Sequence, residues 1–249
     1  MSNTPIIIFE NDDVVIVDKP AGLMVHEDGF SEAPTVVDWL LAYAPAVKGV
    51  GEPGISPQGK ELERSGVVHR LDSETSGILI LAKNQDAFTH LKKQFQDRLV
   101  RKVYRALVYG NMKDKWGTID RPIGRSARDF RRRSAQRGAK GMLREALTEW
   151  ECLKNGAYEG EKFAELMLKP KTGRTHQLRV HLKAVDHPIV GDRLYAGNKM
   201  AQSTNLGHKG LALHAYTLDI TLPDGTRSQY MAPIPGAFAE AAARIAPLN

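Results

Sequence analysis

The chain has 249 residues, of which 42% are hydrophobic and 26% are charged, and its formal net charge is +6. This composition is ordinary for a soluble globular protein, and the single cysteine, Cys152, excludes an internal disulfide and a zinc site built from cysteines. No apolar run is long enough to span a bilayer and the N-terminus lacks a secretory signal pattern, so we expect a cytoplasmic protein.

The positive charge is concentrated in residues 121–144. This segment, called the basic segment below, contains nine Lys or Arg residues and one acid, Asp129. Its local charge is therefore +8, and the rest of the chain sums to −2. A local basic patch indicates a polyanionic partner more strongly than an evenly basic chain would.

The N-terminal part predicts strands, a helix and a loop. Apolar runs at 6–10 and 14–17 flank a polar turn and predict two paired strands. Residues 35–44 predict a short amphipathic helix, and residues 45–65, which are rich in Gly and Pro, predict a surface loop. The aliphatic run 78–81 predicts a buried strand.

A second helix is predicted after this strand, with Asn84 as its N-cap. Its apolar positions fall at helical spacing, and Lys92, Lys93 and Gln94 are expected on the exposed side. The expected core positions are Ala87, Phe88, Leu91 and Phe95.

The C-terminal part predicts further strands and two helices. A strand at 103–110 precedes the basic segment, which lacks apolar periodicity and is expected to become ordered on a partner. The expected elements that follow are a strand pair at 147–153 and 163–168 turning at Asn155-Gly156, a helix capped by Thr175 through Val185, a strand at 211–222 and a helix at 236–246. Together these elements predict an α+β fold with a large mixed, mainly antiparallel sheet, flanking helices and an active-site cleft.

Common catalytic motifs are missing from the sequence. His176 and His181 are five residues apart, so on a helix they do not face one metal ion. The glycines at 49–54 lack the Lys-Ser/Thr ending of a phosphate loop, and Ser73 and Ser76 lack a nucleophile elbow. We therefore expect neither a metal nor a nucleotide cofactor.

Asp72 is a different kind of candidate because it lies in a polar loop that leads into the buried strand 78–81. Taken alone, an Asp among Ser, Thr and Gly residues is typical of a turn. Its importance depends on five motifs that occur in order across residues 6–235. These are Asp-Lys-Pro-Ala-Gly-Leu-Met-Val-His (18–26), His-Arg-Leu-Asp-Ser-Glu-Thr-Ser-Gly (69–77), Lys-Val-Tyr-Arg-Ala-Leu-Val-Tyr-Gly (102–110), Gly-Arg-Thr-His-Gln-Leu-Arg-Val-His (173–181) and His-Pro-Ile-Val-Gly-Asp (187–192).

In these motifs the chain resembles the RluA family of pseudouridine synthases, which isomerise uridine in RNA. The resemblance implies that Asp72 is the essential carboxylate, that Tyr104 stacks on the base, and that Arg179 pairs with the carboxylate. It also implies that Arg70 fills the gap left by the flipped base and that Leu178 lines the pocket. A neighbouring arginine keeps a buried carboxylate ionised, and base flipping exposes an atom that is inaccessible in a stacked duplex.

The remaining expected RNA contacts are His69, Arg174 and the basic segment, in which Arg131, Arg132 and Arg133 are expected to grip the RNA backbone. We expect a single catalytic domain over residues 1–249, which acts as a monomer on structured RNA, with ribosomal RNA favoured over transfer RNA. The resemblance begins within the first ten residues, so no S4-type RNA-binding domain is expected ahead of it.

Two alternatives stay open at this stage. One is a non-catalytic RNA-binding or folding factor on the same fold, although Asp72, Tyr104 and Arg179 are all present. The other is a glycosidase acting on nucleosides, which needs paired carboxylates about the bond. Glu74 is near Asp72 in sequence, but nothing in the sequence places its side chain at the same site.

Overall fold

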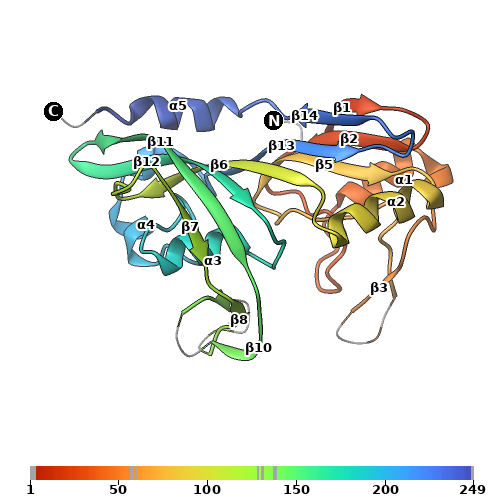
Figure 1. Ribbon diagram of the computed structural model, residues 1–249, viewed down its shortest axis with the longest axis horizontal. Coiled ribbons are helices and arrows are strands. Elements are labelled where there is room, and N and C mark those ends of the chain that lie inside the picture. Colours follow the sequence, from red (N-terminus) through yellow and green to blue (C-terminus); the bar gives the residue numbers. More distant parts are fainter. Residues whose placement is uncertain are drawn as a thin grey trace. The chain divides into compact units, whose positions relative to one another are not determined.

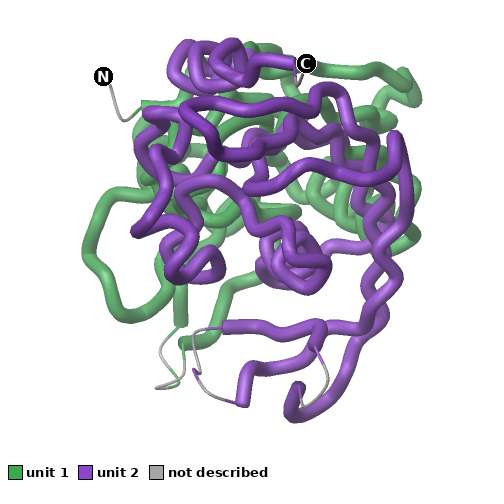
Figure 2. Tube along the Cα trace, turned by 90° about the vertical axis from the view of Figure 1, so that its left-hand side faces the viewer, with its two compact units in different colours: residues 1–102, 215–233 green, residues 103–214, 234–249 purple. Residues whose placement is uncertain are grey.

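The computed structural model describes residues 4–56, 59, 61–127, 129, 132–136 and 139–247. The chain divides into two compact units, shown in different colours in Figure 2. The first unit comprises residues 1–102 and 215–233, and the second comprises residues 103–214 and 234–249. None of the helices in the described ranges has the length and apolar character that crossing a membrane requires.

The first unit is built on strands in the order β1-β2-β5-β13, with β14 paired to β13. Strand β5 is buried along nearly its whole length, and α1 and α2 lie on the same side of these strands in Figure 1. The elements are β1 (Ile6–Glu10), β2 (Val14–Lys19), α1 (Val36–Tyr43), a 3-10 turn (Pro45–Val47), β3 (Gly54–Ile55), β4 (Glu61–Leu62), β5 (Ser76–Ala82), α2 (Gln85–Gln96), β13 (Leu213–Thr221) and β14 (Arg227–Met231).

In α2 the predicted N-cap Asn84 and the core positions Ala87, Phe88 and Leu91 are confirmed, but Phe95, also predicted as a core position, is only partly buried. Asn84 accepts a hydrogen bond from the amide of Ala87 at 2.9 Å and caps α2. Thr35 and Asp38 form a capping box at the start of α1. Gln94, however, is only 6% exposed, because its side-chain amide binds the backbone of Thr221. Its expected place on the exposed side of α2 was therefore wrong.

The second unit contains strands in the order β6-β12-β11-β7. In Figure 1, α5 lies on one side of β11 and β12, and α3 and α4 lie on the other. The elements are β6 (Arg101–Tyr109), β7 (Trp116–Asp120), β8 (Ile123–Arg125), β9 (Arg133–Ser134), β10 (Lys140–Arg144), β11 (Leu147–Tyr158), β12 (Glu161–Pro170), α3 (Gln177–Ala184), α4 (Asn198–Gln202), a 3-10 turn (Asn205–Gly207) and α5 (Gly236–Arg244).

The β11–β12 hairpin corrects the predicted turn. Asn155 and Gly156 lie inside β11, opposite Ala164 and Phe163, and the chain turns at Glu159-Gly160 instead. Both of those residues have positive φ angles, 49° and 80°, as a type I′ hairpin turn requires. Gly156 is needed within the strand because a Cβ atom there would lie 2.0 Å from the carbonyl oxygen of Ala246.

The basic segment contains regular structure that the sequence did not predict. Strands β8, β9 and β10 form a separate three-stranded sheet in the order β10-β8-β9. In Figure 1 the labelled β8 and β10 project away from the other strands of this unit. The expectation of an irregular segment was therefore wrong for these residues, since a small sheet forms there without apolar periodicity.

The α+β class with a large, mainly antiparallel sheet is confirmed, since the strand pairs with a described register are antiparallel. The predicted motifs fall in both units, and the single-domain organisation stays a prediction.

Candidate active site

The loop that carries Asp72 is fixed within the first unit by three hydrogen bonds to two of its backbone carbonyl oxygens. The carbonyl oxygen of Asp72 accepts from the amide of Thr75 at 3.0 Å, which closes the turn. The next carbonyl, that of Ser73, accepts from the amide of Gly22 at 2.8 Å and from the Lys19 ammonium at 3.0 Å. The half-buried Asp72 side chain is thus presented on a rigid turn at the start of β5.

Lys19 is the residue that sequence reasoning missed in this loop. Its side chain is fully buried, and its Nζ atom donates to the carbonyl oxygens of Pro20, Leu23 and Ser73 at 2.8–3.0 Å. Burial lowers the pKa of Lys19 to about 7, although attraction to Asp72 and then Asp18 opposes this. The available signal was a lysine at the end of an apolar strand, directly before a Pro-Ala-Gly turn.

Gly77 allows the strand after the loop to pack closely. Its φ angle is 112°, and a Cβ atom there would lie 2.2 Å from the carbonyl oxygen of Ala215 on β13. Any side chain at this position would push β5 away from its neighbour. The glycine at the end of the Asp72 motif therefore has a packing reason within the first unit.

His69 and Arg70 occupy different environments in the first unit. The His69 ring stacks on Phe95, and its Nε2 atom accepts from the amide of Ile80 at 3.2 Å. Burial lowers the pKa of His69 to about 3, so the ring is neutral and holds the loop against β5 and α2. Arg70 is exposed, and its Nη1 atom lies 3.3 Å from Nε2 of the buried His26.

Arg179 lies on α3 in the second unit and is 4% exposed. Its Nε and Nη2 atoms donate to the two carboxylate oxygens of Asp192, each at 2.8 Å. One oxygen of Asp192 also accepts from the amides of Leu194 and Tyr195 at 3.0 Å. A bidentate pair of this kind fixes the plane of a guanidinium, so Asp192 sets the orientation of Arg179.

The side chains of His181 and Gln177 also hold α3 in place. His181 is fully buried, with Nδ1 2.9 Å from the Thr148 hydroxyl and Nε2 3.0 Å from the Arg121 carbonyl oxygen. Gln177 donates to the Leu147 carbonyl oxygen at 3.0 Å. The polar residues of the 173–181 motif therefore bind α3 to β11 and to the start of the basic segment.

The other predicted residues of the second unit, Leu178, Tyr104 and Arg174, make separate contacts. Leu178 is buried in the hydrophobic core, and Tyr104 on β6 packs against the same core opposite Leu168. The Nε atom of Arg174 donates to the carbonyl oxygen of Glu145 at 3.0 Å, which anchors this arginine near the end of β10.

The basic segment is described only in part, and Arg131 lies outside the described residues. Arg132 forms an ion pair with Asp129 at 3.3 Å, and Arg133 begins β9. Arg121 donates to the Ala184 carbonyl oxygen at 2.7 Å, where a cation complements the C-terminal end of α3. Arg121 is therefore a structural contact of α3, although it is exposed, and Arg125, Lys140 and Arg144 are exposed cations further along the segment.

The structure places Asp72, Arg70 and His69 in the first unit and Tyr104, Leu178, Arg174 and Arg179 in the second. The expected pairing of Asp72 with Arg179 joins residues of different units and stays a prediction. Within the described ranges, His, Cys, Asp and Glu side chains form no group of three that could hold a metal ion.

The sequence of the chain matches the family model for RNA pseudouridylate synthase over residues 13–184. It is 37% identical to an uncharacterized RNA pseudouridine synthase of Synechocystis sp. over 95% of this chain and 68% of that protein. It is equally identical, with the same coverage, to the ribosomal large subunit pseudouridine synthase D of Borreliella burgdorferi.

A solved structure, human RNA pseudouridylate synthase domain containing 1, superposes with a TM-score of 0.71 and 27% identity, covering 94% of this chain and 84% of that one. The chain belongs to the RNA pseudouridylate synthase family.

Proposed function

We propose that the chain converts uridine to pseudouridine in ribosomal RNA, with Asp72 as the catalytic carboxylate. The observation that carries this proposal is the rigid turn on which Asp72 is presented, braced by the buried Lys19 ammonium. When protonated, the Lys19 ammonium attracts the Asp72 carboxylate, and an ionised carboxylate is the form required of a base or nucleophile. The resemblance of the motif at residues 69–77 to the family's catalytic motif supports the same role.

The reaction breaks the N1–C1′ bond of uridine, rotates the base, joins C5 to C1′ and releases the C5 proton. In this proposal Asp72 drives bond cleavage and Tyr104 stacks on the rotating base. Arg179, oriented by Asp192, supplies the counter-charge. Arg70 is exposed, with its Nη1 atom 3.3 Å from Nε2 of His26, and in this proposal it enters the space left by the flipped nucleotide.

Ribosomal RNA is the proposed substrate for two reasons. The relative from Borreliella burgdorferi is named for the large ribosomal subunit. The basic segment also offers a cationic surface that binds RNA backbone without reading bases. Transfer RNA is the second candidate substrate. We also propose that the protein is cytoplasmic and acts as a monomer.

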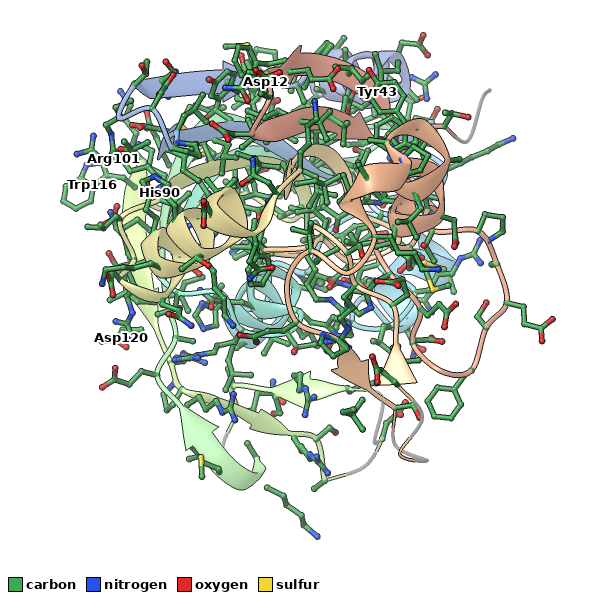
Figure 3. The ribbon with its side chains drawn as sticks, turned by 90° about the vertical axis from the view of Figure 1, so that its right-hand side faces the viewer. Asp12, Tyr43, His90, Arg101, Trp116 and Asp120 are labelled. Carbon is green, nitrogen blue, oxygen red and sulfur yellow. The ribbon has the colours of Figure 1, made fainter. Side chains whose placement is uncertain are left out.

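Pseudouridine mapping in total RNA tests the proposal. Cells are compared with the gene, without it, and with the gene carrying Asp72→Asn or, as a matched control, Asp12→Asn. Asp12 is exposed in the turn between β1 and β2, where Figure 3 labels it.

We expect specific ribosomal RNA sites to disappear without the gene and to return with Asp12→Asn but not with Asp72→Asn. Loss of sites in transfer RNA alone would overturn the ribosomal assignment, and an unchanged map would overturn the function. Release of free uracil by the purified protein would instead indicate a glycosidase.

A further inference from the structure

We propose that Tyr195 is a positioning residue that couples the basic segment to Arg179. RNA bound by the segment then fixes the orientation of the Arg179 guanidinium in the catalytic site. The inference rests on the proposed function, because it treats the basic segment as an RNA contact and Arg179 as part of the catalytic site. All the residues it uses lie in the second unit.

The hydroxyl end of Tyr195 contacts the basic segment. The backbone amide of Arg133 donates to Oη of Tyr195 at 2.9 Å. Arg133 is paired with Arg125, so this bond holds the edge of the β8–β9 pair. A phenol oxygen accepts and donates at once, and Nδ1 of His176 lies 2.8 Å from the same oxygen. One buried hydroxyl therefore joins the segment to the residue that starts α3.

The ring of Tyr195 contacts the catalytic arginine. The guanidinium carbon of Arg179 lies 5.2 Å from the ring centroid, within the range of a cation–π contact. The amide of Tyr195 also donates to Asp192 at 3.0 Å, and Asp192 holds Arg179 in a bidentate pair. Tyr195 thus fixes Arg179 both through its ring and through the carboxylate that orients it.

His176 connects the Tyr195 hydroxyl to the backbone at the start of α3. It is the N-cap of α3 and has a left-handed backbone, with φ 56°, which is unfavourable for a side chain with a Cβ atom. No side-chain hydrogen bond caps the helix there. Since Arg179 is three residues further along, a shift of the Tyr195 hydroxyl acts directly on the turn of helix that carries Arg179.

A purely structural role for Tyr195 predicts something different. The residue is 6% exposed and packs with Ile123, Ala146 and Val180, so any change to it affects stability. If Tyr195 only stabilised the fold, however, removing its hydroxyl would not change how strongly kcat depends on the charges of the basic segment. Tyr195→Phe keeps the ring and removes only the hydroxyl, which separates the two roles.

The first measurement is hydrogen exchange of the Arg133 amide in the protein without RNA. In Tyr195→Phe we expect this amide to exchange about fivefold faster or more, because it loses its acceptor. The control is Tyr158→Phe, since Tyr158 also has an arginine, Arg244, over its ring and lies on β11 in the same unit. An Arg133 exchange rate equal to that of the wild type would contradict the tether, by which we mean the hydrogen bond from the Arg133 amide to Oη of Tyr195.

The second measurement is a double-mutant cycle on kcat for tritium release at saturating RNA. Arg132→Ala with Arg133→Ala should lower kcat in the wild type and in Tyr158→Phe, but not in Tyr195→Phe, whose own kcat falls about tenfold. Independent, multiplicative effects on kcat would overturn the coupling. If the wild type releases no tritium from any RNA, the proposed function fails, and the exchange rate of Arg133 still decides whether the tether exists.

Discussion

At the scale of single residues, Lys19 and Asp192 hold the candidate catalytic groups without being predicted to take part in the chemistry. Both stand inside motifs that the sequence made visible, yet neither motif revealed its role. A lysine after an apolar strand gives no sign that three carbonyl oxygens converge on it. Likewise, the spacing between Arg179 and Asp192 does not show that a helix and a turn bring them into a bidentate pair.

Lys19→Met should change how stability depends on pH. Burial lowers the pKa of Lys19 from 10.5 to about 7, so between these values the unfolded chain binds a proton that the folded chain does not. The free energy of unfolding of the wild type should therefore rise with pH from 7 towards 10.5, by up to about 1.4 kcal/mol per pH unit relative to the variant.

Urea denaturation at several pH values measures this difference, and Lys48→Met, at an exposed position, serves as the control. Curves of the wild type and Lys19→Met that run parallel between pH 7 and 10 would contradict the assignment.

Asp192→Asn should destabilise the second unit and lower the rate. The substitution removes the carboxylate that pairs with the Arg179 guanidinium, which is 4% exposed, and breaking a buried pair from one side costs about 3–5 kcal/mol. Urea denaturation and tritium-release kinetics measure the two effects.

The control is Asp120→Asn, an exposed carboxylate at the end of β7 that Figure 3 labels. A loss of stability below about 1 kcal/mol in Asp192→Asn would mean that Asp192 does not hold Arg179.

At the scale of elements, the sequence predicted strands and helices well where their apolar pattern is strong, as in β5 and α2. The predictions from sequence were wrong where tertiary contacts determine the local backbone conformation. Asn155-Gly156 reads as a turn, but the C-terminal segment packs against Gly156 and keeps β11 extended. Thr175 reads as a helix cap, but the N-cap of α3 is one residue later, the left-handed His176. The strands β7, β14 and those of the basic segment carry too few apolar residues to give a periodic signal.

The basic segment should bind RNA chiefly through charge. Replacing Arg131, Arg132 and Arg133 by Glu should weaken RNA binding at least tenfold at low salt and reduce the slope of log K against log salt by about 2, since each phosphate contact contributes roughly 0.7–0.9. Filter binding of ribosomal RNA over a range of salt concentrations measures both quantities.

A variant with the same change in net charge outside the segment provides the control, with Glu at the exposed lysines Lys48, Lys113 and Lys209. Equal loss of binding in the two variants would show that only net charge matters and that the segment has no special role.

At the scale of the whole molecule, family membership follows from five motifs whose order the sequence alone displayed, and the comparisons confirm it. The motifs are divided between two units, with the Asp72 loop in one and Arg179 in the other. Sequence order could therefore identify the catalytic candidates, but their bracing by buried Lys19 and Asp192 required the three-dimensional contacts within each unit.

The most direct test of the account is tritium release from ribosomal RNA labelled at C5 of uridine, with wild type, Asp72→Asn and Asp12→Asn compared at equal concentration. We predict release by the wild type and by Asp12→Asn, and none by Asp72→Asn, which should still bind the RNA with unchanged affinity. Release by Asp72→Asn at the wild-type rate would contradict the central claim that Asp72 is the catalytic carboxylate.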